Sequence, residues 1–441
     1  MDKRTFINQV AHLFRGQVLY ALTTLVVVAL LAKFGGDGES GRYVLALATT
    51  APIFLLFDLN LRVSRSTDHQ HNEQYRHYVA LRFLCLIFSV LVTVIVCSVY
   101  FHDRIWVFLA MIVFRVGDSI SNLAFGGYQR MQVSDLVGKS LTYKALLSIA
   151  ALLVVIPLTG GNAVVAAMTM GVISITWALL RDLPQSWKVN EPDYEYSIHS
   201  VSNSMKDVNV IGRIARRSLP LGIDASISSL SLNAPRYAIE FFFGTNALGV
   251  FGLLSQLAFS IQMLIGAVGH AGVPVLAKHR VNNNRKQFWR LMNRMLATSG
   301  VVGLLAVIGG TLVIPPVMGY FLGPQYNNVY LVMCLIIASA LTGVLRTAGR
   351  ATQACGSYFT YTMFDVVVFV TSAVASIILV KHYQLTGGAI ALICSFACGM
   401  IVAVVHTYFY LWPTEKQIAA SEPNSEPNSS APENGNPYRP V

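Results

Sequence analysis

The stretch from Val79 to Phe125 contains two long apolar runs that are separated by three polar residues. It reads VALRFLCLIFSVLVTVIVCSVYF, then HDR, then IWVFLAMIVFRVGDSISNLAF. Each run is long enough to cross a bilayer as a helix, which needs roughly 20 mostly apolar residues. So short a connection leaves no room for a folded domain between the runs. The stretch therefore predicts a hairpin of two transmembrane helices.

The same composition extends along most of the chain. Hydrophobic residues make up 54% of the 441 and charged residues only 12%, about half of the ~25% usual in soluble domains. Lipid is therefore the expected solvent. Twelve apolar runs occur, at 17–34, 43–61, 79–101, 105–125, 143–159, 162–180, 219–243, 247–271, 296–322, 328–345, 361–381 and 387–412. The predicted fold class is all-α, a polytopic membrane protein of about twelve transmembrane helices.

The distribution of lysine and arginine predicts the orientation, because cytoplasmic loops carry an excess of these residues. With the N-terminus in the cytoplasm, the inside segments carry 26 of the 32, including those of segments 62–82 and 130–144. The outside loops carry four, and Arg115 and Arg236 lie within spans. Both termini are therefore predicted to be cytoplasmic. The bias also accounts for the net charge of +11 without a nucleic-acid partner.

The longest inside connection, 181–218, is predicted to be a cytoplasmic connector between two halves. Residues 17–180 and 219–412 would each form a six-helix bundle. Residues 1–16 have helical apolar spacing and are expected to lie at the membrane surface, with a frayed terminus as the alternative. Residues 413–441 are rich in Pro, Ser, Glu and Asn and are expected to form a disordered cytoplasmic tail.

A short echo relates the two halves. The first run ends at Phe34-Gly35, with Gly41 following, and the seventh ends at Phe243-Gly244, with Gly249 following. Both places are the first outside turn of their half. Six spans are an even number, so the halves would have the same orientation, as parallel repeats do.

Several catalytic and nucleotide-binding motifs are absent from the sequence. There is no P-loop, no His-Glu-x-x-His, no Gly-x-Ser-x-Gly and no Rossmann fingerprint. The outside loops are too short to hold the donor and acceptor of a membrane glycosyltransferase. We therefore expect no catalytic residue, no metal site and no cofactor, and we expect that the protein is not an enzyme.

The fourth run carries Arg115, Asp118, Ser119 and Asn122 within about 100° of helix surface. Arg115 would lie about 15 Å from the start of the run, where an ionisable group costs at least roughly 2.5–3.5 kcal/mol. The i, i+3 spacing of Arg115 and Asp118 allows their charges to neutralise each other. Two interpretations follow: a structural pair that joins helices, or a cavity-lining pair that meets an anionic substrate or a proton.

The seventh run has polar residues on two opposite faces. One face carries Ser226, Ser229, Asn233, Arg236 and Glu240, and the other carries Asp224, Ser228, Ser231 and Pro235. A lipid-facing helix could not carry two polar faces, so this helix is predicted to be central. Pro235 should bend it beside Arg236, which suits a moving element. Polar contact between packed helices is the structural alternative.

Several stretches in this order resemble the polysaccharide-transport branch of the multidrug/oligosaccharidyl-lipid/polysaccharide exporter superfamily, the Wzx-type O-antigen flippases. They are Leu31–Gly35, Ser40–Tyr43, Leu56–Arg62, Pro235–Ile239, Leu248–Phe251, Pro274–Ala277, Phe321–Tyr326 and Gly387–Ala389. Asn60 departs from the family pattern, in which a glycine is common there. The match covers nearly the whole membrane region.

The resemblance implies two six-helix bundles around a central cavity in a bacterial inner (plasma) membrane. It also implies a cargo such as an undecaprenyl-pyrophosphate-linked oligosaccharide, flipped from the cytoplasmic to the periplasmic leaflet by alternating access. Some relatives couple transport to ions. The expected partners are this lipid-linked oligosaccharide and membrane lipids, with the polysaccharide polymerase machinery as a further option.

By position, seven residues are then the candidates for cavity contacts. Those expected to bind substrate are Arg115, Arg236, Asn122 and Asn233, and those expected to couple an ion are Asp118, Asp224 and Glu240. The arginines would attract the pyrophosphate, and the carboxylates would bind or release a cation.

Two other functions compete with the flippase. A multidrug/cation antiporter of the same superfamily predicts a cavity dominated by carboxylates, and the two mid-membrane arginines argue against cationic cargo. An integral-membrane polysaccharide polymerase or acyltransferase predicts a large outside loop or a catalytic histidine within the membrane.

Overall fold

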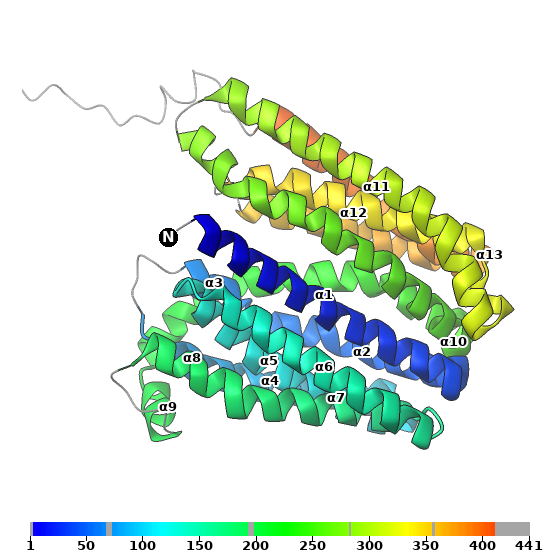
Figure 1. Cartoon of the computed structure of the whole chain (residues 1–441), viewed down its shortest axis with the longest axis horizontal. Helices are drawn as coiled ribbons and strands as arrows, with labels where there is room; N and C mark the ends of the chain where they lie inside the picture. Colours follow the sequence, from blue (N-terminus) through cyan, green and yellow to red (C-terminus); the bar gives the residue numbers. More distant parts are fainter. Residues whose placement is uncertain (1–2, 68–72, 193–197, 282–283, 355–357, 411–441) are drawn as a thin grey trace, which may run out of the picture.

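The computed structural model describes residues 3–67, 73–192, 198–281, 284–354 and 358–410. Across these ranges the ordered elements are all helical, and the long helices lie side by side as one elongated bundle (Figure 1). The predicted all-α fold of a polytopic membrane protein is confirmed. The tail predicted over 413–441 lies outside the described residues.

The first half of the chain forms the lower group of helices in Figure 1. Its α-helices are α1 (Lys3–Phe34), α2 (Gly36–Asp58), α3 (Leu61–Thr67), α4 (Tyr75–Tyr100), α5 (Ile105–Arg130), α6 (Ser134–Leu158), α7 (Ala163–Trp177) and α8 (Leu183–Asn190). A 3₁₀ turn, η1 (His102–Arg104), joins α4 to α5, and a π-helical turn, η2 (Ala178–Asp182), joins α7 to α8. We call this group the N-half. The first helix continues without a break through the boundary predicted at residue 16.

The second half forms the other group. It consists of α10 (Val208–Val281), α11 (Arg285–Leu322), the 3₁₀ turn η3 (Pro324–Tyr326), α12 (Val329–Ala354) and α13 (Tyr358–Tyr410). We call this group the C-half. The short helix α9 (Ile198–Met205) lies between the halves in sequence and packs on α4. The predicted connector therefore contains α8, α9 and the start of α10.

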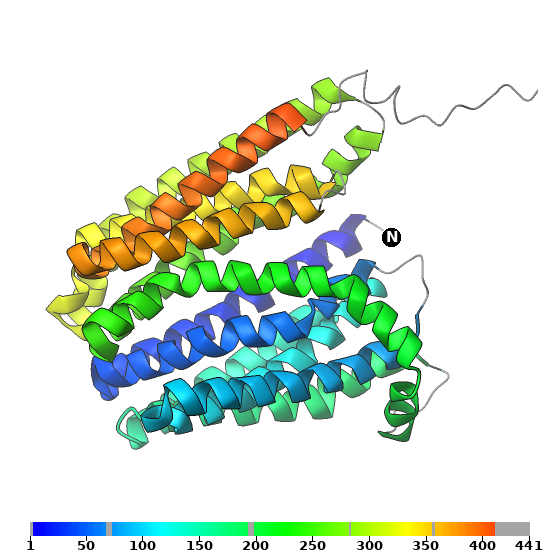
Figure 2. The same ribbon diagram turned by 180° about the vertical axis from the view of Figure 1, so that it is seen from behind.

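Ten helices of the described chain are long and apolar enough to cross a membrane. Two of them are far too long for one crossing: Val208–Ser260 has 53 residues, about 80 Å at 1.5 Å per residue, against a hydrocarbon core of about 30 Å. Each bends back at one non-helical residue, Gly244 in α10 and Gln384 in α13, and Figure 2 shows both reversals. Both bends lie in the gaps between the predicted runs, so the ten helices comprise the twelve runs of the sequence.

Two turns explain local features of the sequence. Gly244 has φ of +78°, a conformation that glycine adopts without steric cost, and the first arm of α10 ends there. Gly36 has the same role in the turn between α1 and α2, with φ of +79°. After α2, Leu59 and Asn60 also have positive φ. Asparagine tolerates the left-handed region better than most residues, which explains how Asn60 can occupy this turn.

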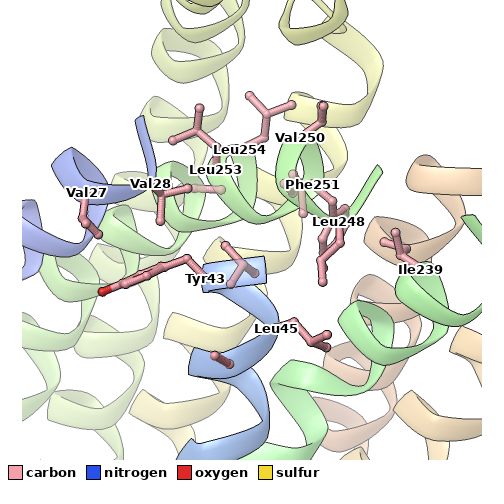
Figure 3. Packing of buried hydrophobic residues seen from close by; sticks show 14 of the residues in the cluster. Val27, Val28, Tyr43, Leu45, Ile239, Leu248, Val250, Phe251, Leu253 and Leu254 are labelled. Atoms are coloured by element: carbon pink, nitrogen blue, oxygen red, sulfur yellow. The ribbon is translucent and has the colours of Figure 1, made fainter. Parts of the chain in front are cut away.

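The two halves meet mainly where α2 packs along α10. Figure 3 shows this seam: Tyr43 and Leu45 of α2 and Val28 of α1 gather beside Leu248 and Phe251 of the second arm of α10. All five side chains belong to one buried apolar cluster that extends into both halves. Burial of this surface gives the halves a continuous core, within which charged side chains must find protein partners.

One end of the bundle carries the short turns at Gly35–Gly36, η1, Gly244, η3 and Gln384, and we call it the loop end. The other end carries the start of α1, and we call it the N-terminal end. The lysine and arginine bias predicts that the loop end faces away from the cytoplasm.

Candidate functional site

An ion pair lies at the end of α2, within the N-half. Arg82 of α4 pairs with Asp58, and its side chain is 2% exposed against 13% for Asp58. The Ser119 hydroxyl of α5 donates to the same carboxylate oxygen. The Nη1 atom of Arg82 in turn donates to Ser119 Oγ at 3.0 Å. Three helices are therefore joined through one carboxylate.

A second carboxylate, Asp118 of α5, has several cations around it. The Tyr20 hydroxyl of α1 donates a hydrogen bond to it at 2.8 Å. Its charge acts on the side chains of Arg62, Arg115 and Lys144, which come from α3, α5 and α6. The carboxylate, its hydroxyl donor and the three cations form one group, on which Asp58 also acts through Arg115 and Asp182 through Lys144. We call these five residues the Asp118 cluster.

Arg115 and Asn122 use partners that the sequence pattern does not reveal. The Arg115 guanidinium donates to the Leu47 carbonyl oxygen at 2.8 Å and to Thr50 Oγ1 at 3.2 Å, both on α2. Asn122 accepts a hydrogen bond from Arg62 at 3.4 Å. Arg115 and Asp118 thus make their hydrogen bonds to different partners, although their charges act on each other.

Lys144 is buried in α6, with 1% of its surface exposed. Its Nζ donates to Ser121 Oγ at 2.8 Å and lies 5.7 Å from the centre of the Tyr20 ring. Asp182, also 1% exposed, accepts from Ser140 at 2.7 Å, and its charge acts on Lys144. This carboxylate therefore extends the charged interior toward the N-terminal end.

The assignment of Arg82 and Lys144 to cytoplasmic loop segments is wrong, because both lie in helices and are buried. Each stands close to the edge of an apolar run, where hydropathy cannot distinguish a loop charge from an interior one. The interior position of Arg82 could have been proposed from the sequence by pairing it with Asp58, the carboxylate at the end of the second run. Nothing in the sequence marks Ser121 as a partner for Lys144.

In the C-half, Arg236 lies on the first arm of α10 and is 8% exposed. Its guanidinium donates to Asn233 Oδ1 at 3.0 Å and to Ser255 Oγ at 3.1 Å on the second arm. The Nε group is buried and has no hydrogen-bond partner among the described residues. The structure thus brings together the two candidates Arg236 and Asn233 and leaves one donor unused.

The first arm of α10 is central, as predicted, because protein covers both of its polar faces. Ser226 donates to the Pro52 carbonyl oxygen of α2 at 2.9 Å, on the N-half side. On the other side Ser228 accepts from Arg346 of α12 at 3.0 Å, and the Ser231 carbonyl oxygen accepts from Ser372 of α13 at 2.7 Å. The two polar faces therefore join the arm to both halves.

The predicted candidates Asp224 and Glu240 lie apart from each other. Asp224 feels the charge of Arg346, which also acts on Asp365 of α13. Arg346 and Asp365, but not Asp224, line a small cavity with space for about one water molecule. Glu240 lies instead at the loop end, where it accepts from Arg104 of η1 at 2.8 Å.

The loop end joins the halves by two further kinds of contact. Tyr326 of η3 donates its hydroxyl to the Asp37 carboxylate at the start of α2. Burial raises the pKa of Tyr326, and the bond to Asp37 raises it further, so the hydroxyl stays protonated and remains a donor. In addition, the backbones approach closely: a Cβ on Gly41 would lie 1.9 Å from the Thr245 carbonyl oxygen, and one on Gly249 would lie 2.1 Å from the Asp37 carbonyl oxygen.

Within the described part of the chain, no group of three or more His, Cys, Asp or Glu side chains could hold a metal ion. The charged interior instead offers guanidinium, ammonium and hydroxyl donors. Such donors suit an anionic group, since arginine forks match the geometry of phosphate oxygens.

Sequence and structure comparisons agree with this architecture. Residues 6–280 match the family described as "Polysaccharide biosynthesis protein". The "Capsular polysaccharide biosynthesis protein CapF" of Staphylococcus aureus is 22% identical over 406 residues, which cover 90% of this chain and 97% of that one.

Solved structures share the fold at low sequence identity. "Lipid II flippase MurJ, inward closed conformation" has a TM-score of 0.68 at 13% identity and covers 89% of this chain and 86% of that chain. The "Inward-facing conformation of a multidrug resistance MATE family transporter of the MOP superfamily" has a TM-score of 0.67 at 14% identity and covers 92% of this chain and 96% of that chain.

A bundle of long apolar helices in two halves, with the fold of these solved structures, defines a multi-pass membrane protein. The chain belongs to the polysaccharide biosynthesis protein family, whose pattern covers more than half of its length. The family resemblance predicted from the sequence is confirmed.

Proposed function

We propose that the protein flips a lipid-linked oligosaccharide from the cytoplasmic to the periplasmic leaflet of a bacterial inner membrane by alternating access. The observation that carries this proposal is the set of basic side chains within the N-half, where Arg62, Arg82, Arg115 and Lys144 outnumber the carboxylates Asp58, Asp118 and Asp182. An excess of cations over carboxylates favours an anionic ligand. An undecaprenyl pyrophosphate head group has the required charge.

Arg236 adds a second cationic group on the other side of the seam. Its unused Nε is a donor held in a protein interior where an unpaired polar group costs roughly 1–3 kcal/mol. A phosphate oxygen would relieve that cost. We propose that Arg115 and Asn122 from the N-half and Arg236 and Asn233 from the C-half bind the head group in a central cavity between the halves.

The relatives support a surface polysaccharide as cargo. The Staphylococcus aureus relative is named as a capsular polysaccharide biosynthesis protein, and the solved flippase is named as a Lipid II flippase. An O-antigen chain of lipopolysaccharide is the specific cargo we propose. The polymerase that would extend it is the proposed partner on the far side of the membrane.

The antiporter alternative has one observation in its favour, the fold shared with the multidrug transporter. The charges near the seam argue against it, because each candidate coupling carboxylate faces a basic group: Asp118 its cluster, Asp224 Arg346, and Glu240 Arg104. Ion coupling through these carboxylates stays a prediction. A polymerase or acyltransferase would be an enzyme, and the family and the shared transporter fold support a non-enzymatic role.

The deciding experiment is deletion of the gene in its native host, followed by lipid extraction from inside-out and right-side-out vesicles. The proposal predicts that a lipid-linked oligosaccharide accumulates on the cytoplasmic leaflet and that surface polysaccharide disappears. Accumulation of unextended repeat units on the periplasmic leaflet would indicate a polymerase instead. Normal surface polysaccharide together with sensitivity to cationic dyes would favour the antiporter.

A further inference from the structure

Arg181 lies in the π-helical turn η2, at an edge of the N-half away from the C-half (Figure 1). Its guanidinium carbon lies 4.9 Å from the ring centre of Trp177 on α7 and 5.2 Å from that of Tyr143 on α6. Both distances are typical of a cation–π contact. The two rings are 6.1 Å apart and tilted by 36°, so one guanidinium group contacts both. We call these three residues the Arg181 site.

The protein interior holds the Arg181 site in place from behind. Trp177 Nε1 donates to Ser140 Oγ of α6 at 3.0 Å, which fixes the plane of the indole ring. The same Ser140 hydroxyl donates to the buried carboxylate of Asp182 at 2.7 Å. Two consecutive residues of η2 therefore have opposite environments, since Asp182 is buried whereas Arg181 is half-buried beside the two rings. A π-helical turn of this kind is frequent at functional sites.

The N–H groups of Arg181 have no acceptor within the described ranges of the chain, where its contacts are the two rings. The adjacent carboxylate of Asp182 feels its charge but bonds to Ser140 instead. A guanidinium group carries five N–H donors in one plane. Because the rings lie against the group, a ligand must approach the edge of that plane. The fork of donors at such an edge matches the oxygens of a phosphate.

The depth of Arg181 in the bilayer is that of a lipid head group. It comes 18 positions after Ala163, where α7 begins at the loop end. That is about 27 Å at 1.5 Å per residue, against a hydrocarbon core of about 30 Å. Trp and Tyr side chains are themselves enriched at this boundary. Leu180 beside Arg181 is 77% exposed, and Leu147, one turn from Tyr143 on α6, is 49% exposed. These two leucines offer an apolar surface to acyl chains.

We propose that the Arg181 site binds the phosphate of an anionic phospholipid, whose acyl chains lie along Leu147 and Leu180. The inference is independent of the proposed function, because the site lies on the outer surface of the N-half and not at the seam. A zwitterionic lipid fits less well, since its own cation would lie close to the guanidinium group. Inorganic phosphate shares the chemistry of the head group but has no chains to contact the leucines.

The test uses the full-length protein in phosphatidylcholine vesicles that contain a small share of phosphatidylglycerol brominated on its acyl chains. Bromine quenches tryptophan fluorescence on contact, and the difference between each protein and its Trp177→Phe version isolates the signal of Trp177. We expect brominated phosphatidylglycerol to occupy the site about fivefold in preference to brominated phosphatidylcholine, the factor that one basic side chain supplies near an anionic surface.

Two variants should remove that preference. Arg181→Gln removes the cation, and Tyr143→Leu removes one of its rings from a position that is 50% exposed, so neither should prevent folding. Lys139→Gln is the matched control. Lys139 lies one turn from Tyr143 on α6, but it is 48% exposed and already paired with Asp135, so its loss should leave the preference unchanged. Excess inorganic phosphate should not displace the lipid.

Four outcomes would overturn the inference. Equal quenching of the wild type by the two brominated lipids would show that the site does not select a head group. A preference that persists in Arg181→Gln would place the selection elsewhere. A preference lost equally in Lys139→Gln would indicate the general positive charge of this end of the bundle. A preference abolished by inorganic phosphate would identify a site for free anions instead of lipid.

Discussion

Breaking the ion pair between Arg82 and Asp58 from one side only should destabilise the N-half strongly. The Arg82 side chain is 2% exposed, and if Asp58 is lost it keeps Ser119 as a hydrogen-bond acceptor. Two of its nitrogens already lack partners within the described chain. Asp58→Leu therefore strands a buried guanidinium, which costs about 3–5 kcal/mol. That cost corresponds to more than about a hundredfold in the unfolding equilibrium.

The reverse substitution should cost less. Arg82→Met leaves Asp58 with the Ser119 hydroxyl as donor, and its side chain is 13% exposed, so water can reach it. The double variant removes both charges and replaces them with apolar groups of similar size. Such replacements are often neutral or stabilising, so the double variant should be more stable than Asp58→Leu alone.

Equilibrium unfolding in mixed micelles, titrated with a denaturing detergent, would measure these differences. Lys139→Met is the control, because Lys139 pairs with Asp135 at 3.0 Å but is 48% exposed, and an exposed pair contributes about 0–1 kcal/mol. The reasoning is refuted if Asp58→Leu is no less stable than this control. It is also refuted if the double variant is as unstable as the worse single variant.

Three further substitutions test the seam and the loop end. Arg236→Ala should stop export of surface polysaccharide while insertion is retained, and Lys139→Ala should not; export at wild-type protein levels in the first would contradict the binding role. Tyr326→Phe removes a donor to a carboxylate and should cost about 1.5–3 kcal/mol, read as a lower thermal midpoint in detergent; an unchanged midpoint would argue against this contact. Gly41→Ala places a Cβ 1.9 Å from the Thr245 carbonyl oxygen. The clash should push the halves apart at the loop end, so cysteines there should react faster with a thiol-labelling reagent. Gly300→Ala, where nothing lies within 4 Å, should leave labelling unchanged, and equal labelling in the two variants would count against the close contact.

The helices could be predicted well because lipid as solvent imposes a simple rule on apolar length. Even the two reversals were marked in the sequence, since Gly244 and Gln384 fall between predicted runs. The ends of the helices were less predictable. Helix α1 begins at Lys3, whereas the first apolar run is 17–34. Hydropathy measures transfer into lipid and does not register the helical hydrogen bonds that continue into polar sequence.

The site was only partly predictable, because partners across helices are not encoded by spacing. Arg236 and Asn233 are i, i+3 neighbours, and the structure joins them. Arg115 also has an i, i+3 neighbour in Asp118, yet it binds the backbone of Leu47 instead. A carbonyl oxygen near Thr50 and Pro52 carries no signature in sequence. Lys144 was missed for a related reason, since its hydroxyl partner comes from another helix.

The glycine contact at the loop end is reciprocal. Gly41 faces the carbonyl oxygen of Thr245, the residue after one turn, and Gly249 faces the carbonyl oxygen of Asp37, the residue after the other turn. Each half thus offers the other the same backbone surface, related by an approximate two-fold rotation. The contact therefore does not depend on the order of the two halves along the chain. A circularly permuted chain in which the C-half preceded the N-half should form the same two contacts, Gly41 with the Thr245 carbonyl oxygen and Gly249 with the Asp37 carbonyl oxygen.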